Sequence, residues 1–145
     1  MRIILYPFVT IAAIGFALSL VTHLLALCGL TPPGGGLVWG LHIGIFAVWI
    51  PTVIIGNRRI PGSVSNRSWK AFLSECPLWM QRAVQLIFIY AVVNFILFMI
   101  TMSGQPKPVG SAPASVLRGF SGHWMAFYAA AFSTLYSAVK APTSH

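Results

Sequence analysis

Four apolar runs, each about 20 residues long, are the feature that most restricts the folds open to this chain. They cover residues 3–27, 37–56, 78–102 and 120–139. An α-helix needs about 20 apolar residues to cross the hydrocarbon core of a bilayer, and only 7% of the 145 residues are charged, too few to cover a water-soluble domain. The sequence therefore predicts an all-α integral membrane protein in which residues 1–145 form a single membrane domain. Short connections between the runs favour four transmembrane helices in an up-and-down bundle.

Basic side chains are distributed unequally between the two ends of this predicted bundle. Seven of the nine lie at one end: Arg2, Arg58, Arg59, Arg67, Lys70, Arg82 and Lys140. Because cytoplasmic loops carry the excess of Lys and Arg, we expect both termini and the 57–77 loop to be cytoplasmic. The net charge of +8 is then a signal of orientation. It does not indicate nucleic-acid binding, since no segment offers a solvated basic face with stacking or base-reading groups.

The 57–77 loop contains a second helical pattern. Apolar residues recur there at i, i+3, i+4 and i+7, namely Trp69, Phe72, Leu73 and Cys76. This spacing predicts a short amphipathic helix over residues 66–76. We expect it to lie in the membrane interface, with Trp69 and Phe72 toward lipid and Arg67 and Lys70 toward the phosphates.

The last apolar run has a side of small residues and a side of bulky ones. The small side includes Gly122, Ala126 and Ala130, and the aromatic side consists of Trp124, Tyr128, Phe132 and Tyr136. Helices in lipid associate through close packing, for which small residues are suited. The pattern therefore predicts that the small side packs against other helices. It predicts that the aromatic side contacts lipid or a partner protein.

A polar residue, Asn94, lies near the middle of the third run. An amide at that depth needs a hydrogen-bond partner, and such bonds between membrane helices contribute about 1 kcal/mol. We expect Asn94 to join two helices rather than to take part in catalysis.

Three histidines lie at a similar depth, about 5 to 10 Å inside the non-cytoplasmic boundary if each helix rises 1.5 Å per residue. These are His23, His42 and His123. Imidazoles from two helices can ligate haem iron or copper, and the nearby Met99, Met102 and Cys28 are residue types that favour Cu(I). One hypothesis is therefore a cofactor site for b-type haem, copper or quinone at this level. In that case Ser19, Thr22 and Ser121 are the candidate acceptors for the other N–H of a ligating ring. The alternative is that each imidazole is a packing residue bonded to a hydroxyl or carbonyl, for instance Thr22 or a main-chain oxygen of the previous turn.

Other chemistry lacks the residues it requires. Glu75 is the one acidic residue and lies outside all four runs, so the acidic relay typical of proton-driven pumps is absent. A serine nucleophile would have no acid to orient its base. Cys28 and Cys76 lie at opposite ends of the predicted bundle and cannot pair with each other. We expect that the chain is not an enzyme.

These observations favour a non-catalytic accessory or structural subunit of a larger membrane complex of the bioenergetic kind. Such a subunit packs against other membrane-protein subunits and lipids and requires no cofactor. The cofactor-binding hypothesis is the alternative. A third, a small-molecule transporter, would need an oligomer to supply its coupling site. We expect the chain in a bacterial cytoplasmic (inner) membrane. The ending "FSGHWMAFYAAAFSTLYSA" resembles small bacterial membrane proteins without assigned roles.

Overall fold

The computed structural model describes residues 3–59, 72–73, 75–103 and 113–141. All regular structure in these ranges is helical. The long helices are α1 (Leu5–Leu27), α2 (Gly40–Arg59), α4 (Leu78–Met102) and α5 (Ala114–Lys140), and a 3₁₀ turn, η1 (Gly35–Trp39), leads into α2. The all-α architecture predicted from the apolar runs is confirmed.

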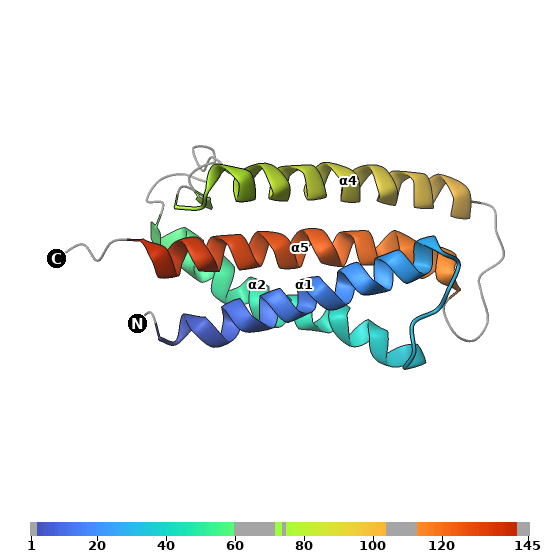
Figure 1. The fold of residues 1–145 in the computed structure, drawn as a ribbon, viewed down its shortest axis with the longest axis horizontal. Helices are drawn as coiled ribbons and strands as arrows, with labels where there is room; N and C mark the ends of the chain where they lie inside the picture. Colours follow the sequence, from blue (N-terminus) through green and yellow to red (C-terminus); the bar gives the residue numbers. More distant parts are fainter. Residues whose placement is uncertain (1–2, 60–71, 74, 104–112, 142–145) are drawn as a thin grey trace.

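The helix α5 is the centre of the molecule. Figure 1 shows it between α4 on one side and the α1–α2 pair on the other, with successive long helices running in alternating directions. Each of the other three packs on α5, and α1 also packs on α2. In contrast, α1 and α4 make little contact with each other. The structure is therefore one helix surrounded by three.

Three segments are long and apolar enough to cross a membrane, namely Leu5–Leu27, Gly35–Arg58 and Leu78–Met102. The sequence predicted four such helices, and α5 is not among the three. Its lower hydrophobicity follows from its position, because Ser121, Ser133 and several other small polar residues of α5 are buried against the surrounding helices. A helix that contacts mainly protein does not need the apolar surface that lipid requires.

Close contacts of glycines with aromatic rings bring the helices together. A Cβ atom on Gly15 of α1 would overlap the ring of Tyr128, and one on Gly44 of α2 would overlap its hydroxyl. On the other side of α5, a Cβ on Gly119 would overlap the ring of Phe98 from α4. The absence of these Cβ atoms lets α5 approach its neighbours at aromatic contacts, as small residues commonly do in membrane helices.

Helix boundaries agree with the sequence in part. The bounds of α4 are those predicted, whereas α5 begins at Ala114 rather than at residue 120. The reason is that hydropathy marks where the chain becomes apolar, while the helix begins after Pro113, whose extended backbone precedes the first turn.

The segment just before α4 packs on α5. Of the predicted interfacial helix, Arg67, Trp69 and Lys70 lie outside the described residues. Leu73 and Cys76 were expected on its membrane-facing stripe, but they are buried in a cluster with residues of α4 and α5. The Cys76 Sγ lies 3.1 Å from the Ser133 carbonyl oxygen, to which it donates a hydrogen bond. This part of the prediction is wrong because small side chains on α5 leave room for protein packing there.

Candidate functional site

A group of polar side chains, of which His23 and Ser121 are buried, joins α1, α4 and α5 at one level of the bundle. His23, near the end of α1, is 2% exposed. Its Nδ1 lies 2.8 Å from the Ser121 Oγ of α5, and its Nε2 lies 2.5 Å from the Tyr90 hydroxyl of α4. The Tyr90 ring meets the imidazole edge-on, with an interplanar angle of 88°. One imidazole thus connects all three helices.

The directions of these hydrogen bonds follow from their outer partners. Ser121 Oγ lies 3.4 Å from the Arg118 carbonyl oxygen, to which it can donate. The hydroxyl then accepts from the protonated Nδ1 of His23, and Tyr90 donates to the Nε2 lone pair. The Asn94 side chain of α4 also donates to the Arg118 carbonyl, at 2.9 Å. The Ser121 hydroxyl and the Asn94 amide therefore both donate to one main-chain oxygen of α5, that of Arg118.

This arrangement favours a structural use of His23. Both ring nitrogens already have hydroxyl partners, so a metal could reach the Nε2 lone pair only by displacing Tyr90. Ser121 was one of the hydroxyls expected beside a histidine from the sequence. A neutral imidazole with one donated and one accepted hydrogen bond is fully paired.

His42 has a different environment on α2. Its Nδ1 accepts a hydrogen bond from Trp124 Nε1 of α5 at 2.9 Å. Since an indole nitrogen can only donate, Nδ1 supplies the lone pair, and the proton of the neutral ring is on Nε2. The side chain is exposed and has ring contacts with Trp39 and Phe120. Of the three histidines, His42 is the one that remains accessible from outside the bundle.

His123 lies among aromatic rings on another side of α5. It stacks on Phe127 at a centroid distance of 5.6 Å and meets Phe95 of α4 edge-on at 4.9 Å. Its Nδ1 is buried and has no hydrogen-bond partner in the part of the chain that the structure describes. Packing against rings, rather than hydrogen bonding, holds this imidazole.

The three histidines thus have separate sets of neighbours. Among the described residues, no group of three or more His, Cys, Asp or Glu side chains is placed to hold a metal ion. The alternating helix directions bring the histidines to a similar level, as the sequence predicted. The described contacts do not bring the imidazoles to a common centre, because His23 bonds to α4 and α5, His42 bonds to α5, and His123 packs on rings of α4 and α5.

The aromatic side of α5 is inside the protein, in contrast with the prediction. Trp124 is 0% exposed and Tyr128 is 2% exposed. The Tyr128 hydroxyl donates to the Leu41 carbonyl at 2.7 Å. The prediction that these two residues contact lipid or a partner is wrong, because α1 and α2 cover them. Phe132 and Tyr136 are half-buried and stack on each other.

The residues predicted to mediate helix packing lie inside the bundle. Gly122, Ala126 and Ala130 are all buried. A Cβ added to Gly122 would lie 2.8 Å from Asn94 Nδ2 and 3.6 Å from His23 Cε1. Gly122 therefore provides the space in which the side chains of α1 and α4 reach α5. Both the small and the bulky side of α5 contact other helices.

Phe72, which was predicted to face lipid from the interfacial helix, is among the residues that the structure describes. It is half-buried, and a Cβ on Gly56 of α2 would overlap its ring. Phe72 thus contacts the end of α2, in addition to any surface it presents to lipid.

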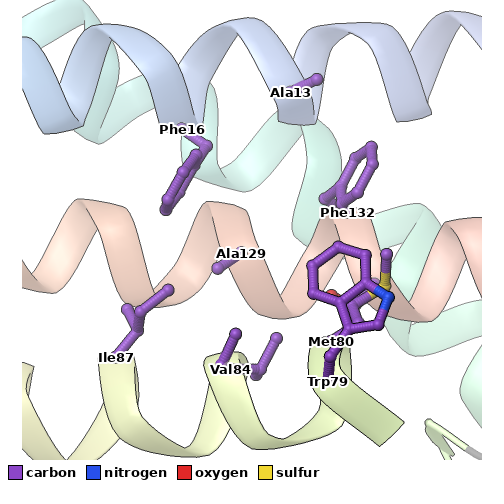
Figure 2. A pocket seen from close by; sticks show the side chains of 10 residues that line it. Ala13, Phe16, Trp79, Met80, Val84, Ile87, Ala129 and Phe132 are labelled. Atoms are coloured by element: carbon purple, nitrogen blue, oxygen red, sulfur yellow. The ribbon is translucent and has the colours of Figure 1, made fainter. Parts of the chain in front are cut away.

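An apolar groove lies between α1 and α4, with α5 as its floor (Figure 2). Its volume is about 270 Å³. It is lined by Ala13, Phe16, Trp79, Met80, Ala83, Val84, Ile87, Ala129, Phe132 and Ser133. The groove exists because α1 and α4 both pack on α5 without closing on each other.

Sequence reasoning missed Tyr90 as the partner of His23, and it missed the groove. A hydroxyl in an otherwise apolar run was the available signal for Tyr90, because a phenol in hydrocarbon needs a partner. The groove had no comparable signal, since Ala13, Ala83 and Ala129 come from three helices and meet only in the fold. No family model, curated protein or solved structure matches the chain.

Proposed function

We propose that the chain is a non-catalytic accessory subunit of a larger membrane protein complex, of the bioenergetic kind, in a bacterial cytoplasmic membrane. The observation that carries this proposal is the use of the polar side chains between α1, α4 and α5. His23, Tyr90, Ser121 and Asn94 bond to one another or to the α5 main chain. Such a network holds helices together and leaves its polar groups occupied rather than presented to a substrate.

The outer surface supports the same proposal. Large apolar side chains are exposed along α1, α2 and α4, among them Ile14, Ile43, Phe46, Ile89 and Ile100. Residues 5–27, 35–59, 78–102 and 114–140 contain no Asp or Glu. A subunit that packs laterally against other membrane chains and lipids needs such a surface.

The proposal includes a topology. All four long helices cross the membrane, α5 being shielded by the other three, and both termini are cytoplasmic. The unequal distribution of Lys and Arg supports this orientation. The alternating directions of the helices in Figure 1 are compatible with it, because the start of α1 and the end of α5 lie at the same end of the bundle.

Extraction in a mild detergent tests the proposal. A tagged chain should migrate in a native gel with partner subunits, at a mass well above its own 15.7 kDa. Another multisubunit complex from the same membrane, shown to stay intact, is the control for the detergent. The proposal fails if the chain migrates alone, without partners, under conditions that leave such complexes assembled.

A second candidate function, binding of haem, copper or quinone, is favoured by His42 alone. That imidazole is exposed, and its Nδ1 bond to Trp124 orients the ring with Nε2 away from α5. In this tautomer the proton is on Nε2, so the ring can donate a hydrogen bond to a quinone carbonyl oxygen, whereas ligation of haem iron or copper by Nε2 requires the other tautomer and the loss of the Trp124 bond. Quinone extraction, visible absorption and metal analysis of the purified chain test this candidate, and a bound quinone, Soret band or stoichiometric copper that disappears in His42→Ala would support it.

A further inference from the structure

The groove between α1 and α4 has apolar walls along its whole length. Phe16 projects into it from α1, and Val84 and Ile87 project from α4, while Ala129 and Phe132 of α5 lie between them (Figure 2). Ser133 is the one lining residue with a hydroxyl. The groove is thus a hydrocarbon-like space beside two helices whose outer surfaces are apolar.

The groove has two different ends. One turn beyond Ile87, Tyr90 of α4 bonds to His23 of α1, and this contact bridges the two walls. At the other end, Trp79 and Met80 belong to the first turn of α4. The groove therefore runs along the helix axes, from a polar bridge inside the bundle to the end of the bundle where α4 begins.

That end of the bundle carries positive charge. Arg82 is exposed and belongs to the same stretch of α4 as Trp79 and Ala83, which line the groove. Arg58, near the end of α2, and Lys140, at the end of α5, are also exposed at this end. Indole and guanidinium groups are the side chains that membrane proteins place at the level of lipid headgroups.

We propose that the groove holds one acyl chain of an anionic phospholipid, whose phosphate is bound by Arg82. An apolar space of this size is unfavourable when empty, because the atoms that line it lose their packing contacts. An acyl chain matches both the apolar walls and the direction of the groove. The positive charge at its open end selects an anionic headgroup over a neutral one.

A helix of a partner protein, about 10 Å wide, is the competing occupant. It would keep lipid out of the groove, so the labelling experiment below distinguishes it from an acyl chain. A lipid site here requires only that α1 and α4 face lipid, so it goes beyond the accessory-subunit proposal and stands independently of it.

Photo-crosslinking in nanodiscs tests the lipid site. The full chain is reconstituted with phosphatidylglycerol or phosphatidylcholine that carries a diazirine on one acyl chain, and labelled peptides are mapped after irradiation. We expect labels concentrated on residues 13–16 and 83–87, with phosphatidylglycerol favoured about fivefold, the effect of one basic residue at a membrane surface.

Two pairs of variants separate the acyl chain from the headgroup. Ala83→Leu fills the groove and should abolish labelling there by both lipids, whereas Ala47→Leu, on the exposed surface of α2, should not. Arg82→Gln should remove the preference for phosphatidylglycerol but leave the position of the labels unchanged. Arg58→Gln, which removes a charge at the same end but on another helix, should keep the preference.

Circular dichroism and gel filtration check that each variant is folded, and Ala13→Leu replaces Ala83→Leu as the filling variant if the latter is not. Labels spread evenly over α1, α2 and α4, or insensitive to both filling variants, would overturn the acyl-chain site. Equal labelling by the two lipids in the unmodified chain would overturn the role of Arg82. None of these results depends on whether the chain migrates with partner subunits.

Discussion

At the scale of single residues, the bond between Tyr90 and His23 is the contact whose loss should be easiest to measure. Tyr90→Phe removes the hydroxyl and leaves Nε2 of a buried imidazole without its donor. We expect a loss of about 0.5 to 2 kcal/mol in the free energy of unfolding in detergent, the range for hydrogen bonds between membrane helices. Tyr6→Phe is the matched control, because Tyr6 is exposed on α1 and its replacement should change little.

A double-mutant cycle shows whether the effect belongs to the pair. His23→Leu should cost more than Tyr90→Phe, since it also removes the hydrogen bond to the Ser121 hydroxyl. The double variant should lose less free energy of unfolding than the sum of the losses in the two single variants. The difference, which is the coupling energy, should be about 0.5 to 1.5 kcal/mol. Strict additivity of the two changes would contradict the hydrogen bond on which the candidate site depends.

Gly15 gives a second residue-scale prediction, which concerns packing. A Cβ there overlaps the ring of Tyr128, which is held between α1 and α2 and bonded to Leu41. Gly15→Ala should therefore lower the free energy of unfolding by about 1 to 3 kcal/mol, as overpacking of a core does. Gly40→Ala is the control, because a Cβ at Gly40 meets nothing within 4 Å. Equal thermal stability of the two variants would show that Tyr128 does not fill this contact.

At the scale of helices, the sequence predicted the existence of α1, α2, α4 and α5 better than their surroundings. Apolar length alone specifies a helix in a membrane protein, and the bounds of α4 were predicted as they are observed. The residue pattern of α5 alone does not show which of its sides other helices cover. A bulky side faces lipid when neighbours cover only the small side, but here Trp124 and Tyr128 are covered as well.

The central position of α5 leads to a prediction about enlarged side chains. Ala126 is buried between α5 and its neighbours, while Ala47 is exposed on α2. Ala126→Leu should lower the free energy of unfolding by about 1 to 3 kcal/mol, whereas Ala47→Leu should leave it nearly unchanged. Thermal unfolding of both purified variants in the same detergent measures the difference. Equal stability of the two variants would contradict the prediction, because it would mean that Ala126 faces lipid.

At the scale of the whole molecule, the candidate site was predictable in its residues but not in its connections. The sequence placed His23, His42 and His123 at one level, and it named Ser121 as a hydroxyl near a histidine. It could not show that Tyr90 bonds to His23 while Trp124 bonds to His42. Those pairings depend on how α1, α2 and α4 are arranged around α5, and the groove between α1 and α4 depends on the same arrangement.

The same arrangement raises the question of whether α5 crosses the membrane, since it is less apolar than the other long helices. We expect that it does, because α1, α2 and α4 shield it and its antiparallel course brings the chain back to the end where α1 begins (Figure 1). A reporter fused after Ser65 should be active in the cytoplasm, and one fused after Ser111 should be active outside. A third reporter fused after His145 decides the point, because it will be cytoplasmic if α5 crosses and external if it does not. Reversal of the first two results would instead overturn the orientation drawn from the basic residues, and with it the placement of Arg82 at the cytoplasmic surface.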